Sequence, residues 1–153
     1  MRTVFLDLEK TIIHSWDDPV IINEVIVTER LTSIRPDLIG IYSFAIYDDR
    51  DRNYFLHSMK QEIEDSFHLK IETSLVFTVQ EIANTILKAQ VKDIQTFIQT
   101  HGKQNSFQEF IITKFKEGEF VLIDDLVENI EVSIDQLNLQ FINPFSKTYS
   151  KLK

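Results

Sequence analysis

The chain opens with the hydrophobic run Thr3-Val4-Phe5-Leu6, which ends in the acidic stretch Asp7-Leu8-Glu9. A second run, Phe120-Val121-Leu122-Ile123, ends in Asp124-Asp125. Short and continuously hydrophobic runs predict strands that are covered on both faces, as in a parallel sheet. Carboxylates at the end of a buried strand repel one another and are costly unless a cation neutralises them. The two runs therefore predict a divalent-cation site at one edge of a sheet.

Hydrophobic runs of this kind predict strands at residues 3–7, 38–43, 73–77, 119–123 and 139–142. Apolar residues at helical spacing predict helices at residues 51–69, 80–89, 93–99, 106–116 and 127–137, with a single turn at 29–34. Strands that alternate with helices are typical of the α/β class. We therefore expect a doubly wound, Rossmann-like fold, in which helices cover both faces of a parallel five-stranded sheet.

Two segments are expected to be additions to this fold. Residues 14–28 place the turn Trp16-Asp17-Asp18-Pro19 between apolar stretches, which predicts a small β-hairpin, or flap, after the first strand. Residues 79–101 leave room for a small helical insertion but not for a large cap. Ligands of open α/β sheets bind beyond the carboxyl ends of the strands. The flap is therefore expected to lie above the acidic residues.

Length and composition limit the classes of protein. A chain of 153 residues, 43% of them hydrophobic, is expected to form one domain over residues 1–153. The lack of cysteine excludes a disulfide scaffold, a cysteine-ligated zinc ion and a thiolate nucleophile, and it fits a cytoplasmic location. The formal net charge of −8 disfavours extended binding to nucleic acid. No hydrophobic run approaches the length of a membrane span, so we expect no membrane association.

Four stretches resemble the motifs of the haloacid dehalogenase (HAD) superfamily, most of whose members are phosphatases. Residues 4–12 resemble the first motif, a hydrophobic strand followed by Asp-x-Asp-x-Thr/Val. Residues 39–43 resemble the second motif, a strand that ends in Ser or Thr, and Gly102-Lys103 is placed like the third. Residues 121–125 resemble the fourth, acidic motif. The resemblance covers the strands of the whole chain and implies a phosphatase-like domain with a minimal cap.

The resemblance implies a role for each acidic residue. Asp7 would be the nucleophile that forms an aspartyl-phosphate. Glu9 would stand where the phosphatases of the family generally carry an Asp as general acid and base. Mg²⁺ would be held by Asp7, Asp124 and the backbone carbonyl of Glu9. Asp125 would hold a metal-bound water or pair with Lys103.

Other residues are expected to contact the phosphate. Ser43 would donate a hydrogen bond to a phosphate oxygen, and Thr11 would orient the loop after the first strand. Lys103 would supply a positive charge to the phosphate and to the nucleophile. Lys114 and Lys116 are alternatives to Lys103, which we prefer because it begins a helix at the ligand-binding edge of the sheet.

The rest of the substrate is expected to contact His14, Trp16 and Phe44. Trp16 is the only Trp of the chain, and a base or another aromatic ring could stack on it. The alternative is that Trp16 packs the flap onto the body of the domain. The expected partner is a phosphorylated small molecule or a nucleotide, and nothing in the sequence indicates an oligomeric state.

The sequence thus predicts a Mg²⁺-dependent phosphohydrolase that acts on a phosphomonoester, with nucleotides and nucleic-acid ends among the candidates. The alternative is a catalytically weak or inactive binding or interaction protein that retains metal and phosphate binding. Glu9 motivates this alternative, because its extra methylene displaces the carboxylate and a misplacement of about 1 Å can cost about 10²-fold in rate. A response-receiver domain is disfavoured, because there the acidic pair follows the first strand and the phosphate acceptor a later one.

Overall fold

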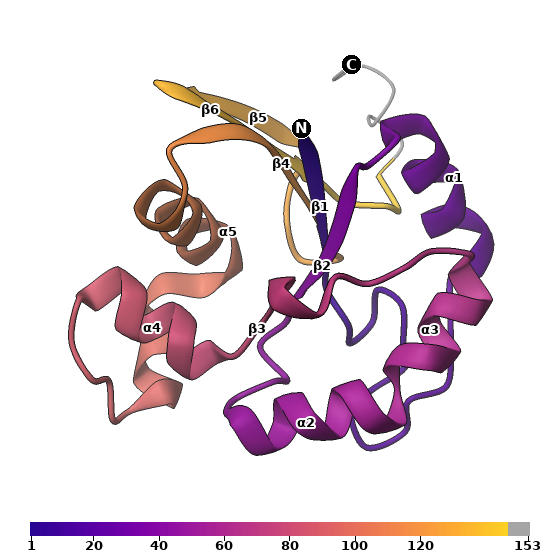
Figure 1. The fold of residues 1–153 in the computed structure, drawn as a ribbon, viewed down its shortest axis with the longest axis horizontal. Helices are drawn as coiled ribbons and strands as arrows, with labels where there is room; N and C mark the ends of the chain where they lie inside the picture. The colour runs from indigo at the N-terminus through magenta and orange to yellow at the C-terminus, as the bar shows by residue number, and fades with distance from the viewer. Residues whose placement is uncertain (147–153) are drawn as a thin grey trace.

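The computed structural model describes residues 1–146 and shows an α/β fold built on one sheet (Figure 1). In chain order its elements are β1 (Arg2–Leu6), α1 (Glu24–Ile34), β2 (Leu38–Tyr42), α2 (Asp49–Ser58), α3 (Lys60–Phe67), the 3₁₀ turn η1 (Thr73–Leu75), β3 (Val76–Phe77), α4 (Val79–Leu87), α5 (Ile94–Lys114), β4 (Glu117–Ile123), β5 (Ile130–Ile134) and β6 (Gln136–Ile142).

Strands β1 and β4 lie side by side in the middle of the sheet, whose order is β3-β2-β1-β4-β6-β5. All strands are parallel except β5, which is antiparallel to β6 at the edge. The chain extends the sheet in one direction through β2 and β3, and in the other through β6 and β5. The strand order therefore reverses between β1 and β4, which is where ligands bind in open α/β sheets. Leu6 lies opposite Ile123, so both strands end at the same height.

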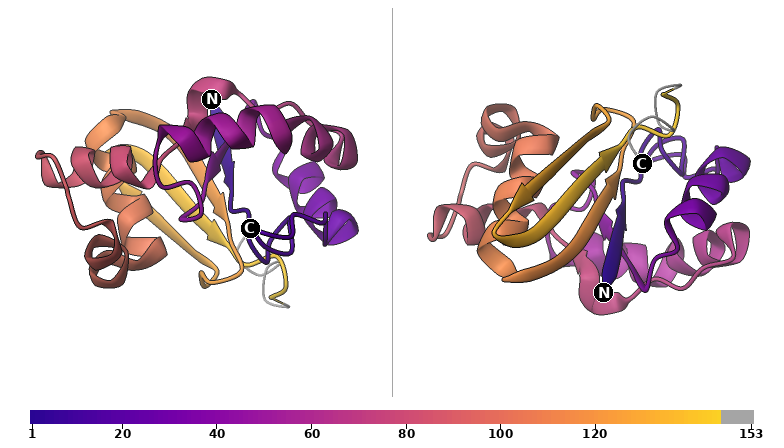
Figure 2. Two further views of the ribbon diagram at one scale, coloured as in Figure 1. Left: turned by 90° about the horizontal axis from the view of Figure 1, so that it is seen from below. Right: turned by 90° about the horizontal axis from the view of Figure 1, so that it is seen from above.

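Helices cover both faces of the sheet (Figure 2). Successive residues of a strand point to opposite faces, so Val4 and Leu6 of β1 join one hydrophobic core and Phe5 joins the other. Residues of α1, α2 and α3 complete the first core, and residues of α4 and α5 complete the second. The second core is rich in aromatic rings; Phe107 packs edge-on against Phe5 with 5.6 Å between ring centroids.

Glycine at position 40 lets the chain before β3 lie directly on β2. A Cβ atom at Gly40 would lie 2.5 Å from the carbonyl oxygen of Leu75 and 2.8 Å from a ring carbon of Phe5. Carbon atoms do not approach this closely without displacing the backbone. The absence of a side chain at Gly40 therefore permits η1 to pack over the sheet and brings β3 alongside β2.

The expected α/β class is confirmed, but the expected count of five strands is wrong because the described residues form six. The difference lies in residues 127–137, where a helix was expected and where β5 and the turn into β6 are found. Apolar Ile130, Val132 and Ile134 alternate with polar residues along β5. This two-residue period is typical of a strand with one exposed face. Since β5 is antiparallel, the sheet is mostly rather than wholly parallel.

The expected β-hairpin flap over residues 14–28 is also not formed as such. Ile13 and Ile21 make one isolated antiparallel bridge, and the His14 N–H donates to the carbonyl of Val20. The Ile22 N–H also donates to the carbonyl of Ile12, so residues 12–14 and 20–22 pair briefly across the turn. The pairing stops there because α1 begins at Glu24, and its apolar residues pack on the sheet instead of extending the hairpin to residue 28.

The helices differ from expectation in length. α1 is a full helix rather than a single turn at 29–34. The segment 51–69 forms two helices, α2 and α3, that are separated at Met59. α5 joins the two short helices expected before and after Gly102, with a break at that glycine. Among the described residues, no helix combines the length and hydrophobicity needed to cross a bilayer.

Candidate active site

Two carboxylates meet where the strand order reverses. Asp7 is the first residue after β1, and Asp124 is the first residue after β4. The Asp7 N–H donates to the carbonyl of Ile123 at 3.0 Å, which fixes the two strand ends against each other. Asp7, Asp124 and Asp125 each offer a carboxylate oxygen, and these oxygens all lie within 4.8 Å of one another. The structure therefore brings together the acidic residues that the sequence places at two distant strand ends.

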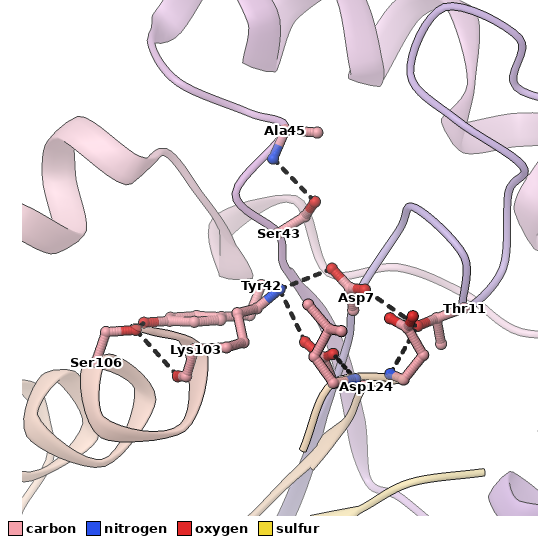
Figure 3. Close-up of polar contacts among 10 residues, drawn as sticks. Asp7, Thr11, Tyr42, Ser43, Ala45, Lys103, Ser106 and Asp124 are labelled. Carbon is pink, nitrogen blue, oxygen red and sulfur yellow. Dashed lines mark hydrogen bonds and ion pairs between the residues drawn. The ribbon is translucent and has the colours of Figure 1, made fainter. Parts of the chain in front are cut away.

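Lys103 lies between the two buried carboxylates (Figure 3). Its Nζ is 2.7 Å from Asp7 Oδ1 and 2.8 Å from Asp124 Oδ2. The second contact is an ion pair without hydrogen-bond geometry, so Asp124 Oδ2 is buried without a hydrogen-bond donor among the described residues. Gly102 directs Lys103 here, because its φ of 71° and ψ of −177° interrupt α5 immediately before the lysine. Glycine adopts this positive φ without the steric cost of a Cβ atom.

Negative charge is in excess in this cluster, which fits a divalent cation. Asp7, Asp124 and Asp125 can carry three negative charges against the single positive charge of Lys103. Carboxylate oxygens are the hard ligands that Mg²⁺ prefers. Asp124 is fully buried and its Oδ2 is 2.8 Å from Lys103 Nζ, so a single ammonium faces two buried carboxylates. The residues present therefore fit Mg²⁺.

Burial and neighbouring charges shift the pKa values of the cluster. Burial raises the pKa of Asp7 to about 6, with Lys103 opposing this shift and Asp124 adding to it. Burial also raises the pKa of Asp125, and the charge of Asp124 raises it further. Burial acts to lower the pKa of Lys103, but Asp7 and Asp124 outweigh it, so the pKa of the ammonium is raised. The lysine is therefore protonated at neutral pH, while ionised Asp7 is held at a cost.

Thr11 joins the loop after β1 to the loop after β4. Its hydroxyl donates to Asp7 Oδ2 at 3.0 Å and accepts a hydrogen bond from the Asp125 N–H at 3.2 Å. Asp125 Oδ1 is also 3.3 Å from the hydroxyl, but a hydroxyl has one proton and donates to one carboxylate at a time. Thr11 is fully buried. It therefore orients the Asp7 carboxylate, and its expected contact with phosphate stays a prediction.

Ser43 and Phe44 follow β2 at the same edge of the sheet. Ser43 is buried, and its Oγ accepts a hydrogen bond from the Ala45 N–H at 3.2 Å. This bond uses a lone pair of the hydroxyl, so the proton is still able to be donated to a phosphate oxygen. Phe44 lies beside the lysine, with Lys103 Nζ 4.9 Å from its ring centroid.

The two alternative lysines lie elsewhere. Lys114 is the last residue of α5, and its Nζ is 5.4 Å from the ring centroid of Phe77. Lys116 is exposed before β4. Only Lys103 of these three is in contact with Asp7, because the break in α5 makes it the first residue of a new helical segment at the carboxyl edge of the sheet.

Glu9 is near the site but is turned toward the loop that follows it. Its Oε2 accepts a hydrogen bond from the backbone N–H of Trp16 at 2.8 Å. The Trp16 ring packs against Tyr54, with 5.5 Å between ring centroids. His14 is exposed, and its Nδ1 is 3.8 Å from Asp18 Oδ2. The contact between Trp16 and Tyr54 agrees with the alternative in which Trp16 packs the segment after β1 onto the body of the domain. The substrate roles of His14 and Trp16 stay predictions.

A pocket of about 420 Å³ opens beside the carboxylates. Its lining combines charged residues with apolar side chains: Asp7, Glu9, Lys10, Ser43, Phe44, Ala45, Ile98, Lys103, Asp125 and Leu126. The nucleophile, the lysine and the serine expected from the sequence therefore share one cavity. Of the three residues expected to contact the rest of the substrate, Phe44 lines this pocket, whereas His14 and Trp16 are not part of its lining.

Sequence reasoning missed Asn143, which follows β6. Its side-chain N–H groups donate to the carbonyls of Asp125 at 3.1 Å and Val127 at 3.2 Å. Its own backbone N–H donates to Asn129 Oδ1 at 2.7 Å. Asn143 therefore holds the loop that carries Asp125. The pair Asn143-Pro144 directly after β6 is the one sign of this role in the sequence. The partners of Asn143 lie 14–18 residues away, so only the fold identifies them.

Neither a protein-family model, nor a curated protein, nor a solved structure matches this chain. The resemblance to the HAD superfamily therefore rests on the four motifs alone.

Proposed function

We propose that this chain is a Mg²⁺-dependent phosphohydrolase of the HAD type that cleaves a phosphomonoester through an aspartyl-phosphate on Asp7. The observation that carries the proposal is the arrangement of Asp7, Asp124 and Lys103, with Lys103 Nζ 2.7 Å and 2.8 Å from the two carboxylates. Structural ion pairs also bury opposite charges, but this one faces a pocket at the switch point of the sheet.

Mg²⁺ would be held by Asp7, Asp124 and the backbone carbonyl of Glu9, with Asp125 beside it. When bound, the ion would offset the repulsion between carboxylate and phosphate and stabilise the charge of the transferring phosphoryl group. Lys103 would hold the attacking carboxylate in place and contribute a second positive charge. The Ser43 hydroxyl would donate to a phosphate oxygen.

The reaction would take place in two displacements. In the first, an oxygen of Asp7 bonds to phosphorus as the bond between phosphorus and the leaving oxygen breaks. The leaving oxygen takes a proton from the carboxylic acid of Glu9. In the second, Glu9 takes a proton from a water molecule whose oxygen attacks phosphorus as the bond between phosphorus and the Asp7 oxygen breaks. Inorganic phosphate leaves, and the carboxylate of Asp7 and the acid of Glu9 are restored.

A second candidate is a binding protein that retains the metal and phosphate site but turns over slowly. It is favoured by one observation, the hydrogen bond between Glu9 and the Trp16 N–H. Glu9 lines the pocket, but this bond holds its Oε2 toward the loop, so Glu9 would have to protonate the leaving group from Oε1 or give up the bond. The conformation of the loop after β1 would therefore determine whether Glu9 acts as the acid, and this is what distinguishes the two candidates.

Phosphate release from a panel of phosphomonoesters, including nucleotides and phosphorylated nucleic-acid ends, tests the proposal. Asp7→Asn is expected to lower Mg²⁺-dependent release by about 10³-fold or more, since the nucleophile is lost. Asp135→Asn is the matched control, because Asp135 is an exposed turn residue with a φ of 52° that Asn also adopts.

The same protein distinguishes the two candidates. Beryllium fluoride with Mg²⁺ imitates a phosphoryl group on Asp7 and is expected to raise the melting temperature of the wild type but not of Asp7→Asn. A thermal shift together with turnover supports the hydrolase. A shift without turnover on the whole panel supports the binding protein, and the absence of both rejects the site.

A further inference from the structure

The mouth of the pocket carries an apolar lip, which we define as Phe44, Ile98 and Leu126. These three side chains line the same cavity as Asp7 and Lys103. Leu126 directly follows Asp125 and is 80% exposed, the second most exposed large hydrophobic residue of the part of the chain described. A single exposed leucine is ordinary, whereas several apolar side chains gathered around one charged pocket form a patch of the kind that marks a binding surface.

Leu126 is held on a fixed backbone. Its N–H donates to Asp124 Oδ1 at 2.7 Å. The carbonyls of the residues on either side of it, Asp125 and Val127, both accept from the side chain of Asn143. Val127 is itself buried in the second core. The exposure of Leu126 is therefore imposed by the structure around it and is not the result of a loose loop.

Ile98 and Phe44 are fixed from other elements. Ile98 lies in the half of α5 that precedes Gly102, and its neighbour Phe97 is buried and stacks on His101 with 4.5 Å between ring centroids. Phe44 packs against Tyr42, with 6.2 Å between ring centroids. The small helical insertion thus contributes one apolar wall to the pocket, and the loop after β4 contributes another.

A phosphate seated near Lys103 would direct its leaving group toward this lip. The lip side chains have no hydrogen-bonding group to offer. Where a polyol leaving group contacts the lip, its hydroxyls would lose water without gaining partners from these three side chains. A hydrocarbon or aromatic group would instead cover Leu126, and the burial of both apolar surfaces would favour binding. The pocket, at about 420 Å³, lies within the size range of sites for small ligands.

We infer that the site selects phosphomonoesters whose leaving group is apolar, and that Leu126 is a specificity-determining residue. This inference rests on the proposed function. The apolar lip would distinguish substrates by the chemistry of the group that carries the phosphate, whereas the metal and the nucleophile would act on the phosphate itself.

A matched pair of substrates tests the inference: cyclohexylmethyl phosphate and glucose 6-phosphate. Both present a six-membered ring on a CH₂–O–phosphate group, and they differ mainly in the ring hydroxyls. The wild type with Mg²⁺ is expected to have a kcat/KM about tenfold or more higher for cyclohexylmethyl phosphate.

Leu126→Ser is expected to lower kcat/KM for cyclohexylmethyl phosphate about tenfold, mainly through KM, and to change that for glucose 6-phosphate by less than about twofold. Leu87→Ser is the matched control, since Leu87 is a 47% exposed leucine at the end of α4 and outside the pocket lining. The control is expected to behave as the wild type with both esters.

A non-hydrolysable analogue, cyclohexylmethylphosphonate, separates the inference from the proposed function, with binding measured by thermal shift in Mg²⁺. Turnover of both esters without a preference, or an equal loss on both in Leu126→Ser, overturns the inference and leaves the hydrolase in place. Leu126-dependent binding of the phosphonate without turnover of either ester supports the apolar lip and overturns the hydrolase. Neither turnover nor binding overturns both.

Discussion

Polar side chains are buried at the carboxyl ends of β1 and β4 but exposed on the β5–β6 hairpin of the same sheet. Asp7 and Asp124 are buried around Lys103, whereas Glu131 and Ser133 of β5 are exposed. Polar groups on an exposed strand face cost little, but buried charges lose their hydration and have to be compensated. Burial keeps the pKa of Asp7 raised to about 6 even with Lys103 at 2.7 Å. The buried charges lie at the carboxyl ends of the central strands β1 and β4, whereas the polar residues of the edge strand β5 are exposed. Buried charges that cost stability are typical of a functional site.

Removing the lysine is expected to have the largest effect on stability. Lys103→Met would leave two buried carboxylates without their cation, and we expect a loss of about 3 kcal/mol in the free energy of unfolding at neutral pH. Urea denaturation measures this loss. Lys92→Met, at an exposed lysine before α5, is the control and is expected to change stability by less than about 0.5 kcal/mol. A loss from Lys103→Met as small as that of the control would mean that the ion pairs do not compensate the buried charges.

Asp7→Asn is expected to stabilise the protein in the absence of metal, and increasingly so as the pH rises. The pKa of Asp7 is raised from 3.8 to about 6 on folding, so between these values the folded state binds more protons than the unfolded state. The stability of the wild type therefore falls as the pH rises through this window, by up to about 3 kcal/mol. The variant lacks this loss, so its advantage should be small near pH 4 and reach a plateau above about pH 7.

The pH dependence of Asp7→Asn can be compared with a carboxylate of the hairpin. Glu131→Gln, on the exposed face of β5, is expected to change stability by less than about 0.5 kcal/mol at every pH. Denaturation of both variants across the acidic range measures the difference. An advantage of Asp7→Asn that does not vary with pH would rule out a raised pKa as its cause.

Magnesium is expected to stabilise the wild type, because it binds the folded site and not the unfolded chain. The gain would be about 2.7 kcal/mol at a Mg²⁺ concentration 100 times its dissociation constant. Since the metal competes with the proton on Asp7, the thermal shift should grow as the pH rises through about 6. A chelator should reverse the shift, and Asp124→Asn should abolish most of it. An equal shift in Asp124→Asn would place the ion elsewhere.

The smallest effect is expected from the polar face of the hairpin itself. Ser133→Ala removes a hydroxyl that lies 3.1 Å from Asn138 Oδ1 at an exposed position. We expect a change in unfolding free energy within about 0.5 kcal/mol and no change in the response to Mg²⁺. A large destabilisation would show that the stability of the hairpin depends on this exposed hydroxyl, and the contrast with the buried site would be lost.

The sequence predicted the two acidic strand ends better than it predicted the edges of the fold. Strands β1 and β4 are continuous hydrophobic runs that end in carboxylates, and both signals are local. The helix expected at residues 127–137 failed because its apolar residues fit a helical period only loosely, whereas their alternation fits an exposed strand. The flap expected at residues 14–28 is reduced to a short pairing, because α1 begins at Glu24 and packs on the sheet. The contacts of Asn143 join residues distant in the chain and have no local pattern.

The sequence by itself determined the α/β class, the two acidic strand ends and the residue types of the candidate site, because hydrophobic periodicity and the position of a charge after a buried run are properties of neighbouring residues. Only the tertiary structure decided that β1 lies beside β4, that a break at Gly102 selects Lys103 among the lysines, and that Leu126 stands exposed at the mouth of the pocket. The first two outcomes depend on contacts between residues about 100 positions apart, and the third on Asn143, which lies 18 positions after Asp125. Such contacts are fixed by packing and charge compensation and not by local preference.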